Sequence, residues 1–185
     1  GRLDPVDVPE YERALYEDGA LASVVARLAP SFHYVLLDAP SGLGSITRAA
    51  LAVSDFALVP VQAEALALRS IGQVLRVIER VREHDNPKLA LLGLLPTMVD
   101  IGDERSQAVL GELWNGFAGV LETVVPRAAV FGAASHAGLP LAFLGGRKSP
   151  EARRYELLAA EVDGMVKQLM GGADDGETRP QRELF

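Results

Sequence analysis

Four short runs of apolar residues stand out along the chain. They cover residues 33–38, 56–61, 89–96 and 121–125, and β-branched side chains contribute to them. None of the runs alternates cleanly between polar and apolar positions. An unbroken apolar run is typical of a strand that is buried on both faces, as in a parallel sheet. The pattern therefore predicts four buried parallel strands.

The segments between the runs carry helical periodicity. Residues 64–83 place their aliphatic side chains on one stripe, at spacings of three and four positions. The members of this stripe are Leu68, Ile71, Leu75 and Ile78. Residues 103–117 repeat the pattern with Val109, Leu110, Leu113 and Trp114. Strands that alternate with helices in this way predict an α/β fold, a doubly wound and mostly parallel sheet with helices on both faces.

A last helix is predicted from its start signals. Ser149 is a suitable N-cap, and Pro150 suits the first helical position. We expect this helix to bury a long apolar stripe, made of Tyr155, Leu158, Val162, Met165 and Leu169. Residues 171–185 are rich in glycine and charge and are predicted to be a disordered tail. Residues 1–170 are accordingly assigned to one α/β domain.

Composition narrows the possible environment and partners. The 185 residues include no cysteine, which excludes disulfides and thiolate metal sites and suits a reducing cytoplasm. With a net charge of −7, any contact with nucleic acid must come from a local basic patch. The longest apolar stretch, residues 89–99, falls short of the roughly 20 residues that span a bilayer. We therefore expect a cytoplasmic protein without a membrane partner.

The loop after the first run carries candidate chemistry. In doubly wound sheets, ligands bind beyond the carboxyl ends of the strands. The first run ends at Asp38, which is followed by Pro40, Gly42 and Gly44. A carboxylate at this place can hold Mg²⁺ through water, and the glycines let backbone N–H groups approach a phosphate. Alternatively, Asp38 caps the next helix and the glycines form a tight turn. The pattern alone leaves both interpretations open.

Several short strings follow one another at the ends of the predicted strands. They read DAPSGLG at 38–44, PVQAEALAL at 60–68, GLLPTMVD at 93–100, PR at 126–127 and GLP at 138–140. In this order and spacing they resemble the ParA family of partition ATPases, which belongs to the deviant-Walker P-loop group that also holds MinD. The similarity covers residues 31–163.

The resemblance implies roles for particular residues. Asp38 would hold Mg²⁺ through water, and the backbone from Pro40 through Gly42 to Gly44 would sense the γ-phosphate of ATP. Thr97 and Met98, together with Pro126 and Arg127, would frame the adenine. The family also implies ATP and Mg²⁺ as cofactors, a homodimer that closes with ATP, and an activating partner such as a centromere-binding protein.

The sequence departs from the family in its phosphate-binding loop. The three lysines, Lys88, Lys148 and Lys167, all lie outside a GxxxxGK[ST] string. In the family that loop lies upstream of the region seen here, and the chain starts at Gly1 rather than methionine. We therefore expect a fragment of a ParA-like ATPase that does not turn over ATP alone. One alternative is a non-catalytic scaffold that kept the fold. The other is a MinD-like positioning ATPase, because the string DAPSGLG resembles the switch loop of MinD more closely than that of ParA.

Binding of DNA is only weakly indicated. Ala128 and Val130 stand where the family commonly has asparagine and arginine. If the chain contacts DNA, the residues expected to do so are Arg127, Arg147, Lys148, Arg153 and Arg154. The arginines of residues 64–83 alternate with glutamates, so we interpret that face as solvated and ion-paired.

Overall fold

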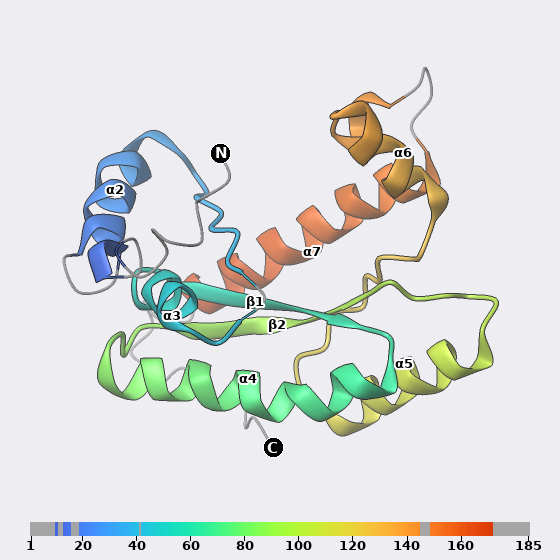
Figure 1. Cartoon of the computed structure of the whole chain (residues 1–185), viewed down its shortest axis with the longest axis horizontal. Coiled ribbons are helices and arrows are strands. Elements are labelled where there is room, and N and C mark those ends of the chain that lie inside the picture. The colour runs from blue at the N-terminus through green and yellow to red at the C-terminus, as the bar shows by residue number, and fades with distance from the viewer. Residues whose placement is uncertain (1–9, 11–12, 16–18, 41, 145–148, 172–185) are drawn as a thin grey trace. The chain divides into compact units, whose positions relative to one another are not determined.

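The computed structural model describes residues 10, 13–15, 19–40, 42–144 and 149–171. The chain divides into two compact units, and each is described by itself. The first unit comprises residues 1–57 and 72–91, and the second comprises residues 58–71 and 92–185. The elements in chain order are α2 (Ala20–Leu28), η1 (Ala29–Ser31), α3 (Ser45–Ala52), β1 (Phe56–Gln62), α4 (Ala65–His84), β2 (Ala90–Thr97), α5 (Glu104–Gly116), α6 (Ala129–Ala137), η2 (Leu141–Phe143) and α7 (Pro150–Gly171) (Figure 1).

The predicted parallel sheet is present, with β1 and β2 as its hydrogen-bonded strands. The N–H of Ala90 donates to the Asp55 carbonyl at one end, and that of Ala63 to the Thr97 carbonyl at the other, both at 3.0 Å. From the first of these hydrogen bonds to the second, the residue number rises in both strands, so the strands are parallel. β2 is buried from Leu92 to Pro96. The α/β fold and two of the four predicted strands are thereby confirmed.

The predicted strand at residues 33–38 is wrong. The structure assigns no strand there, and two of its large side chains are open to solvent: Tyr34 is 48% exposed and Leu36 is 90% exposed. An apolar run shows that a segment is suited to burial, but it becomes a strand only where a neighbouring strand supplies backbone partners. Residues 33–38 have no assigned ladder in the part of the chain that the structure describes.

Residues 121–125 differ from the prediction in a more limited way. Parallel bridges join Leu94 to Val120 and Val99 to Pro126, but no continuous strand lies between the two bridges. The N–H groups of Leu121 and Val125 donate to the carbonyls of Leu94 and Pro96, both at 2.9 Å. Between these two hydrogen bonds the segment advances four residues, from Leu121 to Val125, while β2 advances two, from Leu94 to Pro96. The residues between Leu121 and Val125 therefore bulge away from β2.

A side chain of α7 satisfies the backbone of this bulge. The Glu161 carboxylate accepts from the N–H of Glu122 at 2.7 Å and from that of Thr123 at 3.0 Å. Hydrogen bonds to a charged acceptor are stronger than neutral ones. Glu161 therefore replaces the ladder partners that residues 122 and 123 lack, and it fastens α7 to the bulge.

Replacing Glu161 with alanine is expected to lower the free energy of unfolding by about 2 kcal/mol, because two backbone donors lose their acceptor. Glu161→Gln should lie between the parent and the alanine variant, since its amide nitrogen cannot accept. Urea denaturation followed by circular dichroism measures both losses. The matched control is Glu112→Ala on the exposed face of α5, for which little change is expected. Equal losses for Glu161→Ala and Glu112→Ala would contradict this role.

The helices follow the predicted patterns, except that Trp114 of the predicted α5 stripe is 47% exposed. In α4, Ile71, Leu75 and Ile78 are buried as expected. Asp103 caps α5, where its Oδ1 accepts from the N–H of Arg105 at 3.1 Å. Leu113 of α5 is fully buried. Periodicity identified these helices because each has one face against a core.

The start of α7 is confirmed, but its buried face is not. Ser149 Oγ accepts from the N–H of Ala152 at 3.1 Å, as an N-cap does. The buried residues of α7 are Ala152 and Val166, whereas Tyr155 is 47% exposed. The remaining predicted stripe positions are only half-buried: Leu158, Val162, Met165 and Leu169. A helical stripe shows which face can be buried, and the neighbouring elements decide how much of it is covered.

Gly171 belongs to α7, and the rest of the predicted tail, residues 172–185, lies outside the described residues. In the described ranges, no helix combines the length and hydrophobicity that crossing a membrane requires.

Candidate nucleotide-binding edge

Three chain segments meet at the carboxyl edge of β2 in the second unit. The N–H of Ala63, just after β1, donates to the Thr97 carbonyl at 3.0 Å. On the other side, the N–H of Val99 donates to Val125 at 3.1 Å, and the N–H of Arg127 donates back to Val99 at 2.9 Å. Residues 97–99 are thus held between the end of β1 and the segment around Pro126. The structure brings Thr97, Met98, Pro126 and Arg127, which the resemblance grouped together, into one region.

Met98 has an unusual backbone conformation within this region. Its φ is 55°, and it is the non-glycine residue with positive φ in the described part of the chain. This left-handed conformation is uncommon for a residue with a side chain, and such strain persists where the surroundings impose it. Here the hydrogen bonds of Thr97 and Val99 fix both neighbours. The Met98 side chain is 46% exposed and is available for contact with a ligand.

An ion pair links the first and third segments of the edge. Arg127 Nη2 lies 3.0 Å from Glu64 Oε1, with the side chains 54% and 55% exposed. An exposed pair contributes less than about 1 kcal/mol to stability. The ion pair instead fixes a position, because it holds the Arg127 guanidinium beside the turn after β1. In the sequence, Glu64 stands only within the string PVQAEALAL, which does not predict its pairing with Arg127.

The loop after β2 is held by side chains that the sequence analysis did not single out. Asp100 Oδ1 accepts from the N–H of Gly102, and Ser106 Oγ accepts from the N–H of Asp100, both at 3.0 Å. Ser106 is buried, with 5% exposure. A small apolar cluster contains Ala63, Val99 and Val109, and Leu68, Leu110 and Val124 pack against it. The edge is therefore supported by a packed core.

The candidate phosphate and magnesium loop belongs to the first unit. Asp38 is exposed, and α3 begins after Gly44 without a side-chain cap. The interpretation in which Asp38 caps this helix is therefore wrong. The loop is instead held by Thr47, whose Oγ1 donates to the carbonyls of Gly42 at 2.5 Å and Pro40 at 3.3 Å.

The chemistry of this loop fits a phosphate-bound Mg²⁺. A Cβ at Gly42 or Gly44 would meet open space, so packing within the chain does not require either glycine. In the described residues, no three His, Cys, Asp or Glu side chains are grouped to hold a metal ion. A single carboxylate is sufficient for Mg²⁺, which keeps several waters and takes further ligands from substrate phosphates.

The candidate DNA-binding residues are only partly described. Arg127 is engaged by Glu64. Arg153 is exposed and Arg154 half-buried near the start of α7. Arg147 and Lys148 lie outside the described residues. On α4, the ion pair between Arg82 and Glu79 at 2.6 Å agrees with the interpretation of that surface as solvated and ion-paired. Contact with DNA stays a prediction.

Comparison with known proteins gives the family. Residues 9–91 match the family described as AAA domain. The chromosome-partitioning ATPase Soj of Thermus thermophilus is 39% identical over 138 residues, which are 74% of this chain and 55% of Soj. The chromosome partitioning protein ParA of Caulobacter vibrioides is 35% identical, over 71% of this chain and 49% of ParA.

Solved structures agree with the fold. A cobyrinic acid a,c-diamide synthase from Mycobacterium smegmatis with bound ADP and magnesium has a TM-score of 0.63 and 31% identity, and the match covers 83% of this chain and 54% of the synthase. The cell division ATPase MinD of Pyrococcus furiosus has a TM-score of 0.64 at 22% identity, over 89% of this chain and 64% of MinD, and supports the fold alone.

The parallel sheet and these matches define the chain as part of an α/β domain of the P-loop NTPase class. Within that class, the chain belongs to the ParA/MinD family. It spans about half to three-fifths of the length of the curated relatives that it matches.

Proposed function

We propose that the protein containing this chain is a ParA-like ATPase, an ATP-dependent dimer switch in DNA partition or cargo positioning. The observation that carries the proposal is the edge of the second unit. There the motif residues Thr97, Met98, Pro126 and Arg127 lie together, and Met98 has a strained backbone. Strained residues cluster at ligand sites. The identity with partition ATPases over most of the chain supports the same assignment.

The proposal assigns each candidate residue a role toward the nucleotide. Thr97 and Met98, with Pro126 and Arg127, frame the adenine. Asp38 holds Mg²⁺ through water, and the backbone from Pro40 to Gly44 responds to the γ-phosphate. Bound Mg²⁺ supplies positive charge that stabilises the phosphates during transfer to water. A loop that is ordered by the γ-phosphate and released after hydrolysis acts as a two-state switch.

The partners follow from the same assignment. We infer a homodimer that closes with ATP and an activating partner of the centromere-binding kind, because the relatives are named as chromosome-partitioning proteins. Nonspecific DNA is a further candidate partner, through Arg127, Arg147, Lys148, Arg153 and Arg154. The ion pair with Glu64 already occupies Arg127, so contact with DNA requires Arg127 to exchange that carboxylate for a phosphate.

Phosphate release tests the proposed activity. The 185-residue polypeptide contains no GxxxxGK[ST] string, so we expect no Mg²⁺-dependent turnover of ATP from it alone. The coding sequence directly upstream of Gly1 should encode a GKGGxGKT-like string, and the longer polypeptide that includes it should hydrolyse ATP. Robust turnover by the 185 residues alone would contradict the site assignment. A start codon directly before Gly1 would favour the non-catalytic scaffold instead.

A further inference from the structure

The ion pair between Glu64 and Arg127 bridges the end of β2 in the second unit. On the β1 side, the N–H of Ala63 donates to the Thr97 carbonyl. On the opposite side of β2, the N–H of Arg127 donates to the Val99 carbonyl. The side chains of Glu64 and Arg127 therefore start from opposite sides of β2. Since Arg127 Nη2 lies 3.0 Å from Glu64 Oε1, the two side chains meet across the end of the strand.

Met98 lies at the point where the ion pair crosses. Residues two positions apart in a regular strand direct their carbonyl groups to the same neighbouring strand. The carbonyls of Thr97 and Val99 instead accept from opposite neighbours. The residue between them is Met98, whose left-handed φ of 55° reverses the direction of the backbone groups. Met98 is thus placed between the two segments that carry the charges.

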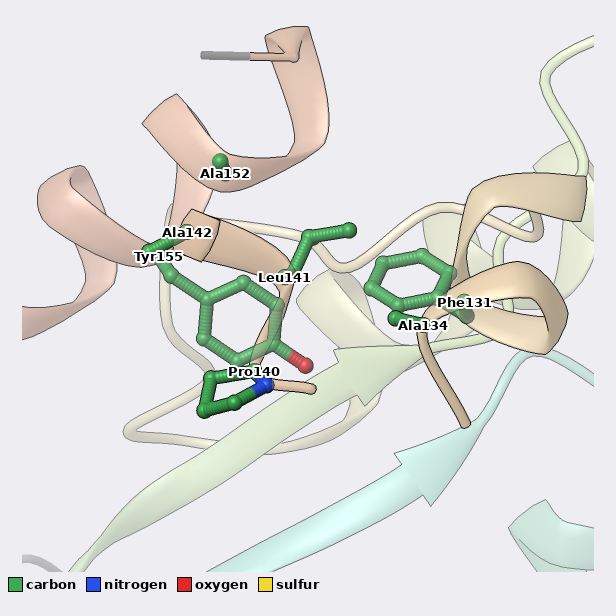
Figure 2. A pocket seen from close by; sticks show the side chains of 7 residues that line it. All are labelled: Phe131, Ala134, Pro140, Leu141, Ala142, Ala152 and Tyr155. Carbon is green, nitrogen blue, oxygen red and sulfur yellow. The ribbon is translucent and has the colours of Figure 1, made fainter. Parts of the chain in front are cut away.

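The backbone on each side of the ion pair is fixed. The N–H of Glu64 donates to the Gln62 carbonyl at 2.8 Å, which closes a tight turn after β1. On the other side, helix α6 follows Arg127. Phe131 of α6 packs edge to face against Tyr155 of α7, with ring centroids 6.2 Å apart, in the wall of an apolar pocket (Figure 2). Both side chains of the pair therefore start from defined positions.

Glu64 occupies a place that would otherwise attract an anion. Arg127 supplies positive charge, and α4, which begins at Ala65, adds the electropositive end of a helix. A phosphate group is attracted by both features. The Glu64 carboxylate already pairs with the guanidinium, so the pair has no net formal charge. A phosphate that approaches must displace this carboxylate and is repelled by it.

A neutral base meets no such repulsion. Guanidinium planes stack on the bases of nucleotides, and a thioether sulfur makes favourable contacts with aromatic rings. Arg127 and Met98 supply these two groups at the edge, and they are 54% and 46% exposed. Because Glu64 holds the guanidinium without burying it, the guanidinium is still open to contact with a ring.

We propose that Glu64 determines what this edge binds, so that the edge accepts the neutral base of a nucleotide and rejects phosphate and other anions. The carboxylate positions the Arg127 guanidinium across the end of β2 and cancels its charge. Glu64 acts through Arg127 and is therefore a positioning residue. This inference rests on the proposed function, in which the edge holds the adenine, and it adds the residue that sets the specificity.

The three methionines of the chain give a local readout of this edge. Met98 belongs to it, whereas Met165 and Met170 belong to α7. Isotope-labelled methionine methyl groups therefore provide one reporter and two internal controls in NMR spectra of the full 185-residue chain. The chain contains no GxxxxGK[ST] string. The seven described residues that line the pocket in Figure 2 include no arginine, lysine or histidine. A shift of the Met98 signal thus reports binding at the edge.

The first ligand is inorganic tripolyphosphate, an anion without a base. Glu64→Gln should bind it at least about fivefold more tightly than the parent, because one repulsive charge is removed and Arg127 is released. About 0.5 M salt should abolish this gain. Glu112→Gln removes the same charge from the exposed face of α5 and should stay within about twofold of the parent, since distant exposed charges are screened. Adding Arg127→Gln to Glu64→Gln should remove the gain.

The second ligand is adenosine, a base without phosphates. It should shift the Met98 signal of the parent and bind several-fold more weakly to Glu64→Gln, because the guanidinium is no longer held in place. Unchanged Met165 and Met170 signals and unchanged circular dichroism would show that the variants are folded.

Two outcomes would overturn the role of Glu64. One is a tripolyphosphate affinity that does not rise in Glu64→Gln, and the other is a rise that persists after Arg127→Gln or is equalled by Glu112→Gln. If adenosine still shifts Met98 in these cases, the assignment of adenine to the edge stands and only the role of Glu64 fails. If adenosine shifts Met98 in neither protein, the adenine assignment fails, and the proposed selection of a base fails with it.

Discussion

Replacing Gly93 with alanine is expected to destabilise the second unit by about 3 kcal/mol or more. A Cβ at this position would overlap the Gly119 carbonyl oxygen and would lie 2.5 Å from Leu121 Cδ1. Neither neighbour can move easily. The Gly119 carbonyl accepts from the N–H of Leu94 at 3.0 Å, and Leu121 is 1% exposed. Overpacking typically costs about 1–3 kcal/mol, and a clash with hydrogen-bonded backbone lies at the upper end or above it.

Gly119 increases this sensitivity further. Its φ is 75°, a conformation that glycine adopts without strain. The approach of two glycines thus lets residues 119–121 pair closely with β2. If alanine at position 93 pushes the pair apart, the bridges on both sides of the bulge at residues 122–124 should weaken together. The loss should then appear as a lower midpoint in urea rather than as a local change.

The control for this prediction is another glycine in the same unit. Gly111 lies inside α5, and a Cβ added there would have no neighbouring atom within 4 Å. Gly111→Ala is therefore expected to stabilise the protein by about 0.5–1 kcal/mol, because alanine favours a helix. Urea denaturation of both variants gives the comparison. Changes of the same sign at the two positions would contradict the packing argument.

The sequence predicted the elements whose apolar pattern reflects their own burial. β1 and β2 were identified from unbroken apolar runs and α4 from its helical stripe, each within one or two residues. Residues 33–38 have the same apolar character, yet Leu36 is 90% exposed. Local pattern records what a segment can bury, whereas strand formation also requires a neighbour. The sequence of the segment itself does not show whether such a neighbouring strand exists.

The bulge at residues 122–124 shows a second limit. Its geometry depends on Glu161, which is 38 positions away from Thr123 in the sequence. On α7 this glutamate has no feature that distinguishes it from a solvated charge. The pair of Arg127 and Glu64, 63 positions apart, is similar. Long-range pairs of polar side chains depend on the folded geometry, so the alternation of residue types does not reveal them.

The candidate site was predicted through its strings rather than through periodicity. Thr97 and Met98 were grouped with Pro126 and Arg127 because their strings resemble those of the ParA family, in which these positions would frame the adenine. The strained backbone of Met98 could not be anticipated, because methionine carries no preference for positive φ. A glycine or asparagine at that position would have indicated it.

Asp38→Asn is expected to reduce Mg²⁺-dependent ATP turnover by at least about 100-fold in the longer polypeptide that includes a phosphate-binding loop. The size follows from losses seen when one preorganised electrostatic contact is removed. Asparagine has nearly the same shape as aspartate but no negative charge, so it is a poorer partner for a water-bound Mg²⁺. Asp38 is exposed, so the free energy of unfolding should change little. Loss of turnover without loss of stability would assign the effect to the nucleotide site.

Asp163→Asn provides the matched control, because Asp163 pairs with Lys167 on α7 at 2.6 Å and lies outside the proposed site. Its turnover should stay within about twofold of the parent, as expected for an exposed i,i+4 pair. Raising the Mg²⁺ concentration should recover part of the activity of Asp38→Asn, since weaker binding of the cation responds to mass action. If Asp38→Asn behaves like Asp163→Asn, another group holds the cation, and the loop from Pro40 to Gly44 loses its assigned role. A partial recovery with Mg²⁺ would instead locate the defect at the metal, because a change in the adenine contacts does not depend on the cation concentration.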